Sequence, residues 1–183
     1  YSIDQEIFIE MIPLSGYIDA GMWTIRLIPG KIVDGAWQMW LPGSTALGTD
    51  TRFLRPVEET TLTIPSTASK VITVGAYDDC GKICYSGRGP TRECICKPDL
   101  CAPGSGILSA APLGAGRGLV YQRKSGTSMA APVVSGAAAL LLEKYPDLTN
   151  VEVKIRMKES AEDLGLPKNW QGWGRIHIGR LTR

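Results

Sequence analysis

Histidine is almost missing from this chain of 183 residues: His177, near the C-terminal end, is the one histidine. Imidazole is the side chain that most often transfers protons at neutral pH. A chain with a single histidine therefore has little capacity for acid–base catalysis by itself. Any such chemistry is expected to need groups that these residues do not supply.

Long apolar runs and an excess of one charge are missing as well. The longest apolar run, from Gly136 to Leu142, is far shorter than the roughly 18 residues of a membrane-spanning helix. Twenty basic and eighteen acidic residues leave a formal net charge of +2, too small for a protein that binds a phosphate backbone. The sequence therefore predicts no membrane span and no nucleic-acid partner, and its 44% of hydrophobic residues predict a packed globular chain.

The first 60 residues have the pattern of β structure. Apolar and polar side chains alternate over residues 6–12 and 23–28, and stretches with proline and glycine separate these two segments from each other and from the rest of the chain. We therefore predict that residues 1–60 contain a small antiparallel sheet.

Residues 61–183 have the pattern of an α/β unit. An almost unbroken apolar run over residues 71–76 is typical of a strand in a parallel sheet, where both faces are covered. Residues 99–104 and 107–110 are two further candidate strands. The alternation over residues 173–178 predicts an edge strand near the C-terminal end.

Two helices are predicted in the same unit. Residues 129–145 are rich in Ala and Leu, and because this helix is apolar nearly all round we expect it to be central. Thr149 and Glu152 have the spacing of a capping box, which predicts a second helix that runs to about Asp163 and ends before Gly165.

One segment is suited to chemistry, the run from Gly126 to Pro132 at the start of the first helix. The first N–H groups of a helix have no partner within it, and the helix dipole is positive there, so an oxyanion beside Ser128 would be stabilised. Gly126 would let a substrate backbone approach closely. The alternative is that Ser128 or Thr127 only caps the helix.

A series of motifs, taken together, resembles the subtilisin-like serine proteases, the subtilase or peptidase S8 family. The longest match is the nucleophile motif, which reads GTSMAAPVVSGAAAL from Gly126 to Leu140. The other matching segments are residues 64–76, 85–91, 97–104 and 172–176. The resemblance covers residues 61 to about 180 and implies a partial subtilisin-like parallel-sheet domain, with Ser128 as the nucleophile, its own N–H as an oxyanion donor and no cofactor.

The same resemblance implies the residues that border the substrate cleft. These are Ser125, Gly126 and Thr127, together with Ile64 and Pro65 in the segment before the strand of residues 71–76. The implied substrate is a peptide or a protein, hydrolysed through an acyl-enzyme. The alternative that stays open is a pseudoprotease, in which the fold binds a peptide or partner without cleaving it.

The catalytic set implied by the family is incomplete in this chain. The family places its residues in the order Asp, His, Ser, and no histidine precedes Ser128. We expect His177, which follows it, to be a structural or surface residue. The chain begins at Tyr1 rather than at methionine, so we expect it to be a piece whose Asp, His and oxyanion-hole Asn lie in an upstream half of the same protein. The isolated chain is expected to be inactive.

Residues 1–60 occupy a place where ordinary subtilisins have only a short connection. They resemble the jelly-roll domain inserted in the clostridial spore-germination (Csp-type) subtilases. This resemblance implies that residues 1–60 are the end of an inserted, jelly-roll-like antiparallel domain and that residues 61–183 are the C-terminal half of the protease domain. The compartment stays open, because secreted, spore and cytoplasmic locations all fit.

Asp99 resembles the acidic residue that, in some subtilisins, joins backbone carbonyls before the strand of residues 71–76 at a weak cation site. A hydrogen-bonding role in a sharp turn is the favoured interpretation, and no metal is predicted. Five cysteines follow one another closely, and their spacing is wrong for a paired zinc site. We expect reduced thiols, with a Cys80–Cys96 disulfide as the alternative. The cysteines are Cys80, Cys84, Cys94, Cys96 and Cys101.

Overall fold

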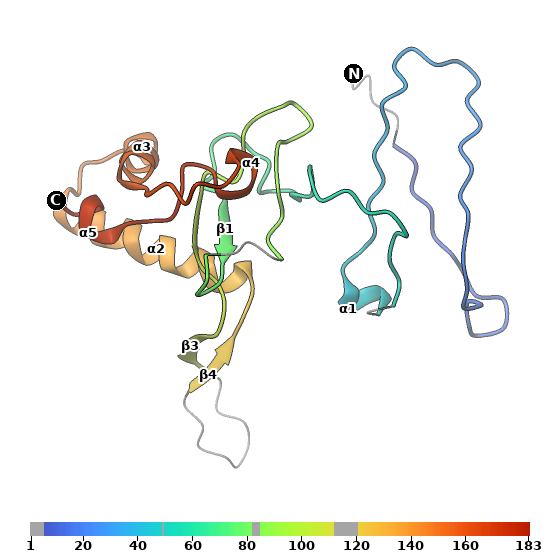
Figure 1. Cartoon of the computed structure of the whole chain (residues 1–183), viewed down its shortest axis with the longest axis horizontal. Coiled ribbons are helices and arrows are strands. Elements are labelled where there is room, and N and C mark those ends of the chain that lie inside the picture. Colours follow the sequence, from blue (N-terminus) through green and yellow to red (C-terminus); the bar gives the residue numbers. More distant parts are fainter. Residues whose placement is uncertain (1–5, 49, 82–84, 112–120) are drawn as a thin grey trace. The chain divides into compact units, whose positions relative to one another are not determined.

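The structure is a computed structural model that describes four stretches of the chain. They are residues 6–48, 50–81, 85–111 and 121–183. The contacts divide the chain into two compact units, Tyr1–Thr51 and Arg52–Arg183. Each unit is described by itself, and Figure 1 follows the chain from blue at the N-terminus to red at the C-terminus.

The first unit has one short helix, α1 (Ser44–Leu47), and its described residues form no strand. The strands predicted over residues 6–12 and 23–28 are therefore wrong, and the jelly-roll-like segment is not confirmed (Figure 1). Alternation makes a strand only when a neighbour accepts its backbone hydrogen bonds and one face is covered. Neither condition is met here, since Phe8 is 86% exposed and Trp23 is 58% exposed.

The second unit is built on a parallel pair of strands, β1 (Val74–Tyr77) and β2 (Leu100–Pro103). The predictions of strands at residues 71–76 and 99–104 are confirmed in place, although both strands are shorter. Ala76, Cys101 and Ala102 are fully buried, as expected for a parallel pair with covered faces.

An antiparallel pair follows, β3 (Ile107–Ala110) and β4 (Tyr121–Lys124). The strand predicted over residues 107–110 is confirmed by β3, whereas β4 was not predicted. All four residues of β4 are exposed, so its sequence has no buried face to give it an alternating pattern. The structure is therefore α/β, with parallel and antiparallel strands.

Helix α2 (Thr127–Lys144) packs against β1 and β2. Its buried residues recur at the helical period and face the strand pair; they are Ala130, Val134, Ala137 and Leu141. The helix is central as predicted, since it contacts β1, β2 and two helices that follow it in the chain, although Leu140 on another face is 46% exposed. Within the described stretches, no helix has the length and apolar character needed to cross a membrane.

The predicted capping box begins helix α3 (Asn150–Ser160), which ends slightly before the predicted limit at Asp163. The Thr149 hydroxyl accepts a hydrogen bond from the Glu152 N–H at 3.3 Å, and the Glu152 carboxylate accepts one from the Thr149 N–H at 2.8 Å. Both bonds satisfy donors that the first turn leaves without partners. The helix then places Val153 and Met157 in the core with α2.

The C-terminal segment contains two short helices, α4 (Lys168–Gln171) and α5 (Ile178–Leu181), and the residues between them lie beside β2. The edge strand predicted over residues 173–178 is reduced to isolated bridges. Cys101 of β2 donates its N–H to Gly174 O at 2.9 Å and accepts from the Ile176 N–H at 2.9 Å. The segment thus lies beside β2 as predicted, but for too few residues to form a regular strand.

Candidate active site

Two glycines set the entry of α2 against the sheet. Gly126, the N-cap, has φ of 147° and ψ of 164°, a conformation that a residue with a Cβ rarely adopts. Its N–H donates to Gly104 O at 2.8 Å. A Cβ on Gly104 would lie 2.6 Å from the Ala76 Cβ, so this close approach requires glycine. The start of α2 is therefore fixed beside the ends of β1 and β2.

The segment before the helix is fixed by two side chains at the end of β4. The Ser125 hydroxyl accepts a hydrogen bond from the Gly106 N–H at 2.9 Å. The Arg123 guanidinium donates to Gly106 O at 2.6 Å. Together these bonds hold the hairpin of β3 and β4 to the turn that leads into α2.

The hydroxyl of Ser128 is free to take part in chemistry. Ser128 is exposed at the second position of α2, after Thr127 at the first. The N-cap is Gly126, and no side chain caps the helix, so the alternative in which Ser128 or Thr127 serves as the cap is wrong. The Ser128 N–H lies in the first turn, where no helical carbonyl precedes it to accept its hydrogen bond. A hydroxyl and a free donor therefore share one position at the positive end of an 18-residue helix.

Ile64 and Pro65, also predicted to border a cleft, form a tight turn before β1. Their peptide bond is cis, and Ile64 is 87% exposed. The Ala68 N–H donates to Pro65 O at 3.0 Å. Among the described residues, no hydrogen bond joins this turn to the start of α2. The structure thus brings Ser125, Gly126 and Thr127 together and leaves the other pair on a separate exposed turn.

His177 is a structural residue, as the sequence predicts. It is the N-cap of α5, and its Nδ1 accepts a hydrogen bond from the Arg180 N–H at 3.2 Å. The Lys144 ammonium donates to Thr182 O at 2.7 Å, which ties α5 to the C-terminal end of α2. Ser128 lies near the other end of α2, about 24 Å from Lys144 at 1.5 Å per residue. His177 therefore does not serve Ser128 as a base.

The hydrogen-bonding role predicted for Asp99 is confirmed. Its carboxylate accepts from the Thr73 N–H at 2.7 Å and pairs with the ammonium groups of Lys97 at 2.6 Å and Lys154 at 2.8 Å. Burial lowers the pKa of Lys97, and the bond to Asp99 opposes that shift. The two lysines were not predicted. Lys154 is 85 positions from Ser69, to which it also bonds, so no local pattern joins them.

The described cysteines are free thiols. Cys80 and Cys96 are both exposed and unbridged, so the alternative disulfide between them is wrong, and Cys84 lies outside the described residues. Burial raises the pKa of the Cys101 thiol to about 12, which keeps it protonated and unreactive at neutral pH. In the ranges that the structure describes, no three ligand-type side chains are grouped as a metal site.

Several known proteases are similar to this chain. The model of the Subtilase family matches residues 45–174. Serine protease AprX of Bacillus subtilis is 34% identical over 149 residues, which cover 72% of this chain and 33% of AprX. Subtilisin DY of Bacillus licheniformis is 36% identical, over 66% of this chain and 40% of its own. The solved structure of the Clostridium perfringens CspB protease aligns with a TM-score of 0.64 and 39% identity, over 72% of this chain and 30% of its own. The chain spans less than half the length of each of these relatives.

Proposed function

The chain belongs to the subtilase family of serine proteases, and on that premise we propose that Ser128 is the nucleophile of a serine endopeptidase. The observation that carries this proposal is the uncapped start of α2, where Gly126 is the N-cap and Ser128 is exposed in the first turn. A serine held there only for stability would cap the helix, and this one does not.

The proposed reaction follows from the atoms at this position. Ser128 Oγ attacks the carbonyl carbon of a peptide bond and gives up its proton to a base. The Ser128 N–H, helped by the positive end of α2, donates to the oxyanion that forms on the carbonyl oxygen. The base returns the proton to the leaving amine, and water then releases the acyl group from Ser128. The substrate class is a peptide or protein.

The base is proposed to come from outside residues 1–183, from an upstream half of the same protein. No histidine precedes Ser128, and His177 caps α5 far from it. Two further features favour a missing neighbour: within the described residues β1 pairs with β2 alone, and Leu140 of α2 is 46% exposed. An unpaired edge and an exposed leucine are what a partly assembled sheet layer would show. The isolated chain is therefore expected to be inactive.

The cleft is proposed to run between the turn at Ser125, Gly126 and Thr127 and the turn at Ile64 and Pro65. Glycine at position 126 leaves room for a substrate backbone, and the Gly106 N–H holds the Ser125 hydroxyl at 2.9 Å. The exposed Ile64 side chain would supply apolar contact to a substrate residue.

Residues 1–60 are proposed to be the end of an inserted β domain of the Csp type. The family model begins at residue 45, so most of this segment lies outside it. Its strands would form only against the rest of that domain, which explains why Phe8 and Trp37 are 86% and 66% exposed here. Hydrogen exchange tests this proposal: the amides of residues 6–12 should be protected in the complete protein and unprotected in this chain.

The proposed activity is tested by peptide hydrolysis with the complete protein and two alanine variants. Ser128→Ala should abolish cleavage, whereas Ser135→Ala should leave it unchanged. Ser135 is a matched control on the same helix, whose hydroxyl donates to Ala131 O at 3.2 Å. A complete protein that binds peptides but never cleaves them would instead be a pseudoprotease, and the proposal would be wrong.

A further inference from the structure

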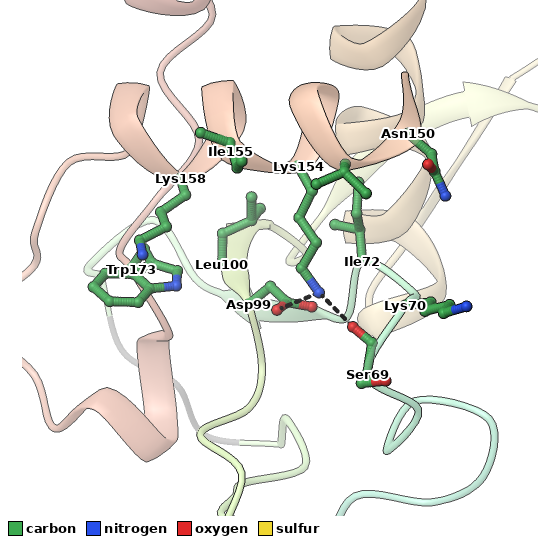
Figure 2. Close-up of a pocket in the computed structure, with 11 residues that line it drawn as sticks. Ser69, Lys70, Ile72, Asp99, Leu100, Asn150, Lys154, Ile155, Lys158 and Trp173 are labelled. Carbon is green, nitrogen blue, oxygen red and sulfur yellow. Dashed lines mark hydrogen bonds and ion pairs between the residues drawn. The ribbon is translucent and has the colours of Figure 1, made fainter. Parts of the chain in front are cut away.

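Lys154 of α3 occupies a cage of oxygen atoms on the surface of the second unit (Figure 2). Its ammonium lies 2.8 Å from Asp99 Oδ1, 3.0 Å from Ser69 O and 2.8 Å from Val71 O. An ammonium has three N–H donors, and here all three have an acceptor. The cage joins α3, the start of β2 and the segment that leads into β1.

A second ammonium, that of Lys97, binds the other oxygen of the same carboxylate. Lys97 Nζ donates to Asp99 Oδ2 at 2.6 Å, to Thr73 Oγ1 at 3.1 Å and to Val71 O at 2.9 Å. The Lys97 side chain is only 1% exposed, and that of Asp99 is 11% exposed. Both ammonium groups are thus fully hydrogen-bonded, and the single carboxylate is shared between two positive charges.

The oxygen atoms of this cage are of the kind that hard metal cations prefer. Calcium binds carboxylate and backbone carbonyl oxygens, which are the donors supplied by Asp99, Ser69 and Val71. A metal ion does not fit beside the groups already present, because two ammonium charges against one carboxylate leave the site positive. It would have to displace Lys154 and then lie next to Lys97 in a poorly solvated place.

We propose that Lys154 is a built-in cation that fastens residues 69–73 to α3, so that this site needs no metal. This role is independent of the role of Ser128. The segment held by the cage leads from the turn at Ile64 and Pro65 into β1. The Lys154 ammonium therefore holds this segment in the same position with or without metal ions in the medium. Removing the ammonium leaves Ser69 O without this donor and leaves Asp99 paired with Lys97 alone, so the link between residues 69–73 and α3 is lost.

The chain offers a matched control one helical turn away. Lys158 is also on α3, and its ammonium lies 3.7 Å from the centroid of the Trp173 ring rather than in the cage (Figure 2). Lys158→Met removes the same charge and the same hydrogen-bonding group from the same helix. Lys154→Met also removes one lysine charge from α3, but this charge is the cation bound in the cage. A difference in stability between the two variants therefore measures the contribution of the cage.

The test is thermal unfolding of the 183-residue chain and both variants, with calcium chloride or with a chelator. We expect neither addition to move the midpoint of the unmodified chain or of Lys158→Met. The midpoint of Lys154→Met should be lower than that of Lys158→Met, both with calcium and with the chelator. The proposal is overturned if calcium stabilises the unmodified chain and Asp99→Asn removes that effect, or if the two lysine variants behave alike.

A second measurement needs no variant that might fail to fold. The lysine ammonium groups of the unmodified chain are observed by ¹H–¹⁵N correlation at neutral pH. Three acceptors should slow the exchange of the ammonium protons, so that two protected signals are seen and persist in excess calcium. Loss of one signal when calcium is added would mean that the metal displaces Lys154, and the proposal would fail.

Discussion

Replacing Ser128 and Thr149 by alanine, one at a time, separates a reactive serine from a structural one. Both residues lie at the start of a helix, but only Thr149 caps one. Thr149→Ala removes the hydroxyl that accepts from the Glu152 N–H at 3.3 Å and donates to the Glu152 carboxylate at 2.7 Å. Loss of such a cap costs about 0.5–2 kcal/mol. Ser128 is exposed behind a glycine N-cap, so we expect Ser128→Ala to change the free energy of unfolding by no more than about 0.5 kcal/mol.

Urea unfolding followed by tryptophan fluorescence measures both free energies in the same chain, which has five tryptophans. Thr149→Ala shows that the assay detects the loss of a cap, and so it is the positive control. The reasoning would be refuted if Ser128→Ala lost as much stability as Thr149→Ala. Ser128 would then be a structural residue, and the motif from Gly126 to Leu140 would no longer be evidence for a nucleophile.

Two other perturbations test the packing of the second unit. Leu141→Ala should lower the free energy of unfolding by about 2–5 kcal/mol, because Leu141 is 0% exposed. Leu140→Ala should lower it by about 0.5 kcal/mol or less. Denaturant unfolding of the two variants tests whether α2 is buried on one face. Cys101 should resist alkylation in the folded chain while Cys80 and Cys96 react, as peptide mapping after labelling would show, and rapid labelling of Cys101 would contradict its burial. Since folding raises the pKa of Cys101 from 9.0 to about 12, its thiolate forms first in the unfolded chain. The contribution of the protonated Cys101 thiol to the free energy of unfolding is therefore present below pH 9.0 and is lost as the pH rises toward 12. The Cys101→Ala variant should lack this pH dependence.

Local signals in the sequence predicted the parts of the fold that depend on local bonds. The capping box at Thr149 and Glu152 marks the start of α3, because the residues that form it are close together in the chain. The glycine before Ser128 marks the start of α2 for the same reason. The strand β1 was predictable because a short, almost unbroken apolar run is typical of a strand covered on both faces.

The failures have the opposite cause, since they depend on partners that are distant or absent. Residues 6–12 alternate well but have no neighbouring strand within the described residues, and so they form none. β4 has no alternation, yet it becomes a strand because β3 pairs with it. Lys154 reaches Asp99 from another element, and no spacing in the sequence predicts that meeting.

Labelling with a fluorophosphonate tests most directly the claim that Ser128 is a nucleophile whose base lies outside this chain. The probe forms a covalent bond only with a serine whose hydroxyl is activated by a neighbouring base. We predict an adduct on Ser128 in the complete protein, none in its Ser128→Ala variant and none in the folded 183-residue chain. An adduct on Ser128 in the isolated chain would contradict the need for an external base. If the folded complete protein formed no adduct on Ser128, the claim that Ser128 is the nucleophile would be contradicted.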